Sequence, residues 1–106
     1  MRTEEERLKS LKKYRRRTFI QYARLGSSVG CKFFLDVSKI DVDTSDDDGN
    51  TGMMVAAKNG HLHTVQFLLS RGAKIGAKNK FGQTALDLAK AKMQKHVVRY
   101  LQGEEV

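Results

Sequence analysis

Residues 46–79 read DDDGNTGMMVAAKNGHLHTVQFLLSRGAKIGAKN, and this stretch decides the fold. It contains G-x-T at 49–51, two alanines at 56–57, Asn59-Gly60-His61, and L-L-x-x-G-A at 68–73. Similar residues recur 33 positions away in both directions, and we expect this period to hold without a gap. The matching residues 33 positions later are Asn79, Gly82, Thr84, Ala89, Val98 and Leu101. Those 33 positions earlier are Thr18, Ala23 and Leu35, and Ile40 and Val42 likewise stand 33 positions before Ala73 and Ile75.

A fixed period of about 33 residues, with a turn and two short helices per unit, is typical of ankyrin repeats. The chain resembles the ankyrin-repeat family on the motifs quoted above, over roughly residues 13–102. The family's T-P-L-H tetrapeptide is incomplete, because Thr51 is followed by Gly-Met-Met and Thr84 by Ala-Leu-Asp. The resemblance implies an all-α ankyrin-repeat solenoid of about three helix-turn-helix units with short projecting β-hairpin-like fingers.

At 106 residues the chain has the length of one domain. We expect an N-terminal helical extension, a degenerate N-capping repeat, one full repeat, a C-capping repeat and a tail. The corresponding ranges are 1–12, 13–45, 46–78, 79–102 and 103–106. Terminal repeats need a polar outer face, and the basic run at 12–17 fits that need.

The first helix is expected over residues 3–25, because Thr3 and Glu6 have capping-box spacing and Gly26 is a stop signal. Ser27 or Ser28 can cap a second helix at about Val29–Asp36. Apolar or small side chains recur along one stripe of the first helix, which predicts its packing face. These are Leu8, Leu11, Thr18, Tyr22 and Leu25.

In the central unit Thr51 can cap an inner helix over about 51–59, and the outer helix is expected over about 61–70. Gly60 suits the left-handed turn between them. Ala73 to Gly82 should form a projecting finger in which Ile75 points inward. In the last unit Met93 occupies the position of Gly60, which leaves the geometry of that turn open.

The net charge of +8 is banded along the chain. Residues 1–24 hold nine Lys/Arg and three Glu, residues 25–50 two Lys and six Asp, and residues 51–106 nine Lys/Arg and three acids. This pattern favours a partner with an acidic patch. The sequence shows neither a long apolar run nor a signal peptide, so we expect an intracellular protein, cytoplasmic or nuclear.

The sequence contains no convincing motif for catalysis or metal binding. The string 43–49 fails as an EF-hand, because Val55 would stand where a bidentate glutamate is needed. His61 and His63 cannot face one metal from the same helix face, and the resemblance implies that His61 makes an inter-repeat hydrogen bond. The lone Cys31 suits a small buried hydrophobe. We expect neither an enzyme nor a bound cofactor or metal.

The resemblance implies protein binding through the finger tips and the concave inner-helix face, by a monomer. Carried over position by position, the protein-binding residues are Asp47, Asp48, Asn50, Lys58, Asn59, Lys78, Lys80, Phe81, Gln83 and Lys92.

The basic run has three readings: a solvated cap face, a nuclear localisation signal or patch for an acidic protein, and a site for nucleic acid or anionic membrane. Nucleic acid is disfavoured, since Tyr14 is the only aromatic residue among the charges. Besides protein binding and electrostatic binding of nucleic acid or membrane, a third class of function remains, in which the chain is the N-terminal interaction part of a larger multidomain protein. The run comprises Lys12, Lys13, Arg15, Arg16 and Arg17.

Overall fold

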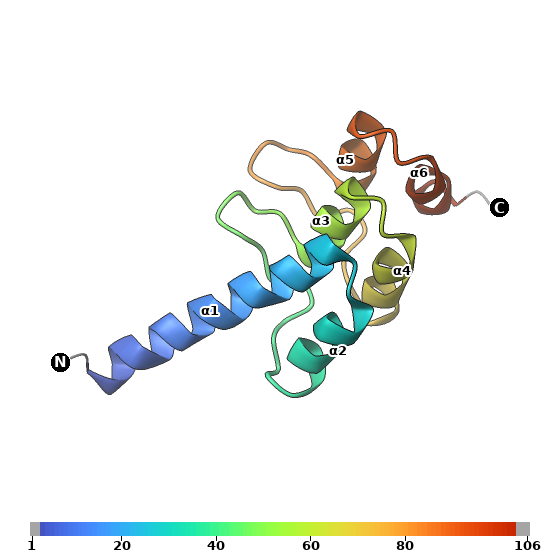
Figure 1. Cartoon of the computed structure of the whole chain (residues 1–106). Coiled ribbons are helices and arrows are strands. Elements are labelled where there is room, and N and C mark those ends of the chain that lie inside the picture. The colour runs from blue at the N-terminus through green and yellow to red at the C-terminus, as the bar shows by residue number, and fades with distance from the viewer. Residues whose placement is uncertain (1–2, 104–106) are drawn as a thin grey trace.

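A computed structural model of the chain describes residues 3–103, which form six α-helices in two layers (Figure 1). The helices of the inner layer pack in the order α1, α3, α5, and those of the outer layer in the order α2, α4, α6. The predicted all-α repeat solenoid is therefore confirmed. The bounds are α1 Glu4–Leu25, α2 Ser28–Asp36, α3 Gly52–Lys58, α4 Leu62–Ser70, α5 Ala85–Ala91 and α6 Lys95–Leu101.

Hydroxyl side chains define the start of the three inner helices. Thr3, Thr51 and Thr84 each accept a hydrogen bond from the backbone N–H three residues on, at 3.2–3.3 Å. Such a cap satisfies one of the donors that a helix start leaves unpaired. Ser27 caps α2 in the same way, accepting from the Gly30 N–H at 3.1 Å. The caps predicted at Thr3 and Thr51 are confirmed, and of the two serines Ser27 does the capping.

The turn between the two helices of each pair is left-handed in all three units. Its φ angle is 76° at Gly26, 78° at Gly60 and 57° at Met93. Methionine adopts this conformation at some cost that glycine avoids. The geometry that the sequence left open for the last unit is thus shared with the others.

The expectation of an uninterrupted 33-residue period is wrong for the first unit. Gly26 and Gly60 are 34 residues apart, whereas Gly60 and Met93 are 33 apart. The extra residue lies in the loop after α2. It lies between Phe34 and Ile40. The Ile40 N–H donates to the carbonyl of Phe34, six residues earlier, whereas the equivalent Ala73 N–H donates to the carbonyl of Leu68, five residues earlier. A loop accommodates such an insertion without disturbing helix packing.

The packing face predicted for α1 is also wrong. Its buried side chains are Phe19, Ile20 and Ala23, whereas Leu8 is 54% exposed and Leu25 63% exposed. Leu11 and Tyr22 are exposed as well, and Thr18 is half-buried. The first half of α1 projects away from the other helices (Figure 1), which leaves Leu8 and Leu11 exposed. Tyr22 lies at the packed end of α1 and contacts Phe34, with 5.8 Å between the ring centroids, but its side chain is still 37% exposed.

The centre of the core is α3, which packs between α1 and α5 and against α4. All of its residues from Gly52 to Ala57 are buried. A Cβ atom added at Gly52 would lie 3.1 Å from the Phe19 ring. Small residues are therefore required where the inner helices approach most closely.

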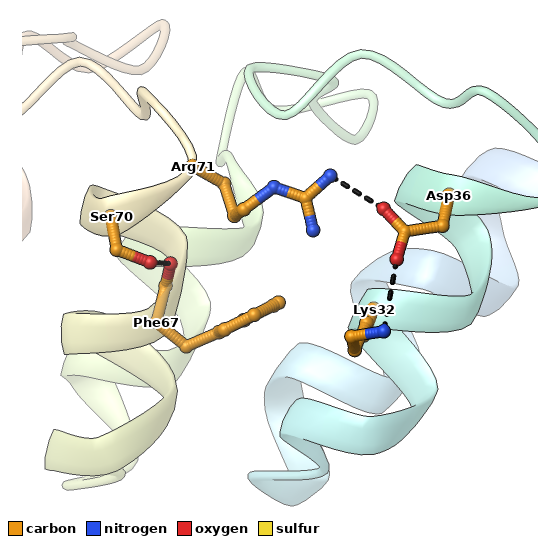
Figure 2. A network of polar contacts seen from close by, with 5 residues as sticks. All are labelled: Lys32, Asp36, Phe67, Ser70 and Arg71. Atoms are coloured by element: carbon orange, nitrogen blue, oxygen red, sulfur yellow. Dashed lines mark hydrogen bonds and ion pairs between the residues drawn. The ribbon is translucent and has the colours of Figure 1, made fainter.

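The outer helices are joined across the first two units by polar contacts near their C-terminal ends. Figure 2 shows Asp36 of α2 between Lys32, at 3.2 Å, and Arg71 after α4, at 2.6 Å. The Arg71 guanidinium also lies 5.8 Å from the centroid of the Phe67 ring. At the other end of these helices the Ser28 and Thr64 hydroxyls lie 3.1 Å apart.

The outward face of the first unit is less polar than predicted. Val29, Phe33 and Val37 of α2 and its C-cap are 82%, 52% and 64% exposed. The basic run does not cover them, because several of its side chains line hollows between α1 and the loop at residues 37–51. None of the helices in the described part of the chain combines the length and the apolar character needed to span a bilayer.

Candidate functional site

Two loops project on the same side of the molecule, finger 1 at residues 37–51 and finger 2 at residues 71–84 (Figure 1). β pairing within the described residues is limited to one antiparallel bridge, Ser45 with Thr51 in finger 1. Each finger tip closes in the same way. The Asp46 N–H donates to the Asn50 carbonyl at 2.9 Å, and the Asn79 N–H to the Gln83 carbonyl at 3.0 Å.

Side chains at equivalent positions hold the two tips. Asp46 Oδ1 accepts from two backbone N–H groups, those of Asp48 and Asn50, at 2.9 Å each. Asn79 Oδ1 accepts from Phe81 and Gln83 at 2.9 and 3.0 Å. A short polar side chain that replaces a backbone acceptor is the usual device for fixing such a turn.

The fingers also contact each other. The Lys80 N–H donates to the Asp48 carbonyl at 3.0 Å, and Asn79 Nδ2 donates to Asn50 Oδ1 at 2.9 Å. A Cβ atom at Gly49, where φ is 80°, would lie 3.0 Å from the Lys80 nitrogen. Glycine therefore allows the backbones to approach, and Asn79 becomes only 7% exposed. The two tips form one preorganised surface.

The sequence-predicted site residues divide into two groups. Asn50 and Gln83 are half-buried and hydrogen-bonded to Asn79, so they build the fingers. Phe81, at the tip of finger 2, is 71% exposed. The other exposed members are Asp47, Asp48, Lys58, Asn59, Lys78, Lys80 and Lys92.

Ile75 was predicted to point inward, and this is wrong, because the side chain is 52% exposed. It occupies a central position of the turn in which the Ala77 N–H approaches the Lys74 carbonyl at 3.4 Å. Central residues of a tight turn face away from the chain that they reverse. Ala73 and Ala77 pack against the core in its place.

A hollow of about 120 Å³ lies between finger 1 and the inner helices. Its lining joins the predicted Asn50, Lys58 and Asn59 to residues that sequence reasoning did not assign to a site. Those are Arg24, Met54, Val55 and Leu88. No signal in the sequence marks the three apolar residues as site residues, because their pattern predicts core positions, and Arg24 stands in no motif.

Charges on this side of the molecule alternate from one element to the next. Arg16 and Arg17 of α1 share a small hollow of about 50 Å³ with Asp46 and Asp47 of finger 1. Finger 2 follows with Lys74, Lys78 and Lys80. The linear charge bands of the sequence thus become adjacent basic, acidic and basic surfaces.

The inter-repeat hydrogen bond expected of His61 is present. His61 Nε2 lies 2.9 Å from the Arg24 carbonyl oxygen, which requires the ring nitrogen to donate. Gln94 stands 33 positions on and makes the matching bond, from Nε2 to the Lys58 carbonyl at 3.0 Å. These bonds satisfy carbonyls at the ends of the inner helices.

The side chains whose pKa departs from its ordinary value have structural explanations. Burial raises the pKa of the Cys31 thiol to about 11. Hydrogen bonds from Arg71 and then Lys32 lower the pKa of Asp36, and a bond from the Thr84 backbone lowers that of Asp87 at the start of α5. Across residues 3–103 no three His, Cys, Asp or Glu side chains group closely enough to hold a metal ion.

Comparison with known proteins gives the same family as the geometry. A family model described as ankyrin repeats (3 copies) matches residues 12–106. NAD-capped RNA hydrolase NUDT12 of Homo sapiens is 46% identical over 55 residues, 52% of this chain and 12% of that protein. Protein glp-1 of Caenorhabditis elegans is 31% identical over 93 residues, which is 88% of this chain and 7% of that protein.

Ankyrin repeat and SAM domain-containing protein 6 of Mus musculus is 45% identical over 43 residues, 41% of this chain and 5% of that protein. The chain therefore corresponds to a small part of each of these relatives. The structure agrees with this family match in three features: three units of paired helices, the Gly-His turn with its inter-repeat hydrogen bond, and two stacked fingers. The chain belongs to the ankyrin-repeat family.

Proposed function

We propose that this chain binds a segment of a partner protein, as a monomer inside the cell, across its two finger tips and the adjoining hollow. Ankyrin repeats are generally protein–protein interaction modules, which makes a non-catalytic binding role the natural starting point. The observation that carries the proposal is Phe81, 71% exposed at the tip of a finger whose backbone is fixed by Asn79. A large aromatic side chain on a rigid support is the usual form of an interface hot spot.

Preorganisation of the fingers supports the same conclusion energetically. Ordering a loop on binding costs free energy that is subtracted from affinity. Here the Asn79 side chain already holds the Phe81 and Gln83 N–H groups, and finger 1 braces finger 2 through the bond between Lys80 and Asp48. A partner would meet a surface that is already in its bound form.

The alternating charges supply specificity. Lys78 and Lys80 of finger 2 and Lys58 and Lys92 at the ends of the inner helices favour an acidic patch on the partner. Asp47 and Asp48 oppose an extended anionic surface, because like charges brought together suppress the wrong partner. The partner proposed is a protein with an acidic patch bordered by basic residues.

The test is Phe81→Ala, compared with Tyr14→Ala as a matched control. Tyr14 is 64% exposed but lies on the projecting half of α1. Both variants should melt like the parent, because neither ring is buried. Phe81→Ala should bind the captured partner more weakly by about 2 kcal/mol, and Tyr14→Ala should bind it normally. Partner affinity and melting temperature are measured for all three proteins, after capture from cell extract treated with nuclease at physiological salt.

A Phe81→Ala protein that binds like the parent removes finger 2 from the site. Early unfolding of that variant would show instead that the ring belongs to the core.

A second candidate is favoured by the basic run of α1, which begins on the projecting half of that helix. Such a surface could bind nucleic acid or an anionic membrane. Phosphate contacts make affinity fall steeply with salt, while a finger-and-groove contact with a protein falls more gently. The salt dependence of binding therefore separates the two candidates. A place within a longer multidomain protein is compatible with either.

A further inference from the structure

A basic hollow lies between α1 and the base of finger 1. Its volume is about 250 Å³, and its walls come from positions 12–16 of α1 and 38–41 of finger 1. The walls carry four cations and one carboxylate: Lys12, Arg15, Arg16 and Lys39, with Asp41. Folding thus divides the basic run of the sequence, directing part of it toward a segment more than 20 residues away.

In the part of the chain that the structure describes, none of the four cations has a carboxylate oxygen within ion-pair distance. Ion pairs within residues 3–103 join only Asp36 to Lys32 and to Arg71. The Asp41 carboxylate stabilises the turn of its own loop, because its Oδ1 accepts a hydrogen bond from the Asp43 N–H at 2.8 Å. Arg15 is half-buried, so part of its hydration is already lost. A half-buried unpaired guanidinium gains more from an anion than an exposed one does.

The backbone at Lys39 is a second observation at the same hollow. Its φ is 56°, in the left-handed region that a side chain disfavours. The equivalent position after the next outer helix is Gly72, with a φ of 93°. A lysine thus occupies a position where glycine would be less strained, and its side chain lines the hollow. Strain of this kind is found at functional positions, and here it coincides with the lining of a basic hollow.

The size and charge of the hollow define the ligand. Sites that enclose a whole small molecule measure about 300–1,000 Å³, so this one suits a single charged group carried by something larger. Two guanidinium and two ammonium groups match a phosphate dianion, which arginine binds in a bidentate manner. We propose that the hollow binds the phosphate of a phosphorylated serine or threonine in the partner segment, an inference that rests on the proposed function.

The surroundings favour a phosphorylated protein segment over a membrane. Asp41 lines the hollow, and Asp46 and Asp47 line the small hollow that adjoins it at Arg16. An anionic bilayer is an extended surface and would be brought against these carboxylates, whereas one phosphate on a peptide would not. Arg16 lines both this hollow and the small hollow against Asp46 and Asp47. A chain lying along finger 1 could therefore place a phosphate here.

The experiment titrates the ¹⁵N-labelled full chain with a blocked Ala-phosphoserine-Ala tripeptide, and with its unphosphorylated form, at matched ionic strength. Saturable amide shifts confined to positions 12–16 and 38–41 are expected for the phosphorylated form alone. The affinity should fall when the pH drops below about 6, since the phosphate then loses its second charge. No partner protein is needed, so this result is independent of the Phe81 test.

Three variants sharpen the readout. Arg15→Gln with Arg16→Gln should weaken tripeptide binding at least tenfold, while Arg7→Gln with Lys9→Gln, the same charge change elsewhere on α1, should change it less than twofold. Lys39→Gly should weaken binding severalfold and at the same time raise the melting temperature, because it removes the strained side chain. A merely structural role for Lys39 cannot give that combination.

The proposal is overturned by absence of saturable tripeptide binding, or by equal loss in the hollow and control variants. It is also overturned if the tripeptide fails while the chain sediments with vesicles of phosphatidylcholine and phosphatidylserine through Arg15 and Arg16. That outcome would assign the hollow to a lipid surface.

Discussion

At the scale of single residues, the backbone conformations show which side chains this fold tolerates and which it prefers. The turn inside each helix pair has a positive φ, yet two units carry glycine there and the third carries methionine. A Cβ at Gly60 would meet the Gln94 side chain at 2.5 Å, and one at Gly26 would meet the His61 ring at 2.6 Å. In the first two turns glycine is therefore needed for space as well as for conformation. Met93 has no repeat stacked over it in the described residues.

Met93→Gly should stabilise the protein by about 0.5–1 kcal/mol. The substitution relieves a φ of 57°, and it removes little packing because the side chain is 75% exposed. Urea unfolding of the variant checks this, with Met93→Ala as the control that removes the side chain but keeps the Cβ. A less stable glycine variant would mean that the Met93 side chain contributes more to α5 and α6 than its exposure indicates.

Cys31 should make stability depend on pH in the alkaline range. Burial raises the pKa of the thiol from 9.0 to about 11, so the unfolded chain loses its proton before the folded one does. The contribution of the protonated thiol to the free energy of unfolding is fully present below pH 9. It is lost as the pH rises toward 11, at about 1.4 kcal/mol per pH unit. The free energy of unfolding is compared with that of Cys31→Val, which has no ionisable group. Parallel curves for the two proteins above pH 9 would contradict this.

At the scale of elements, α3 determines how closely the units stack. It is seven residues long and contacts helices on both sides, so its core positions can accept little extra volume. The fingers show the same close fit in polar form, because Asn79 serves its own turn and its neighbour at once. Neighbouring units are therefore closely fitted both between their inner helices and between their fingers.

Ala56→Leu should destabilise the protein by about 1–3 kcal/mol through overpacking. Ala56 is 0% exposed, in the middle of the helix that lies between α1 and α5. Ala91→Leu is the matched control, since Ala91 is exposed at the end of α5. Urea melts of the two variants should differ clearly. If both match the parent, the inner helices are less tightly packed than described.

At the scale of the whole molecule, stability and recognition lie in different parts. The extents of 53 × 28 × 20 Å reflect the projecting half of α1, which carries the basic run but buries nothing before Phe19. The packed units supply a rigid support for the fingers. The alternating charges then lie on that support rather than inside it.

Removing residues 1–11 should change the free energy of unfolding by no more than about 0.5 kcal/mol, as for surface changes that disturb no buried contact. A second truncation that removes residues 1–20 should unfold the protein, because it takes Phe19 and Ile20 from the core. Circular dichroism with urea distinguishes the two. A loss of about 2 kcal/mol or more in the shorter truncation would show that the projecting half packs on the body, or on another copy, in solution.

The repeat architecture could be predicted because its signals are local. A threonine before a helix, a glycine where φ must be positive, and Ala56-Ala57 where helices crowd each act within one turn or one contact. The four helices whose bounds were predicted begin and end within one residue of the predicted positions. The His61 bond followed from the family resemblance. The exposed finger residues followed from their positions in the repeat, and their role in binding stays a prediction.

Tertiary packing decided what the local signals could not. Leu8 and Leu11 were predicted on the packing face, but burial depends on whether another element arrives there, and none does. The additional residue after α2 left no periodic mark, since a loop absorbs it. The basic hollow arises only when α1 and finger 1 meet, because a charge pattern along the chain does not determine which cations lie together in space. Local signals therefore predict the units and their turns, whereas which faces are covered and which charges converge depends on contacts between segments far apart in the chain.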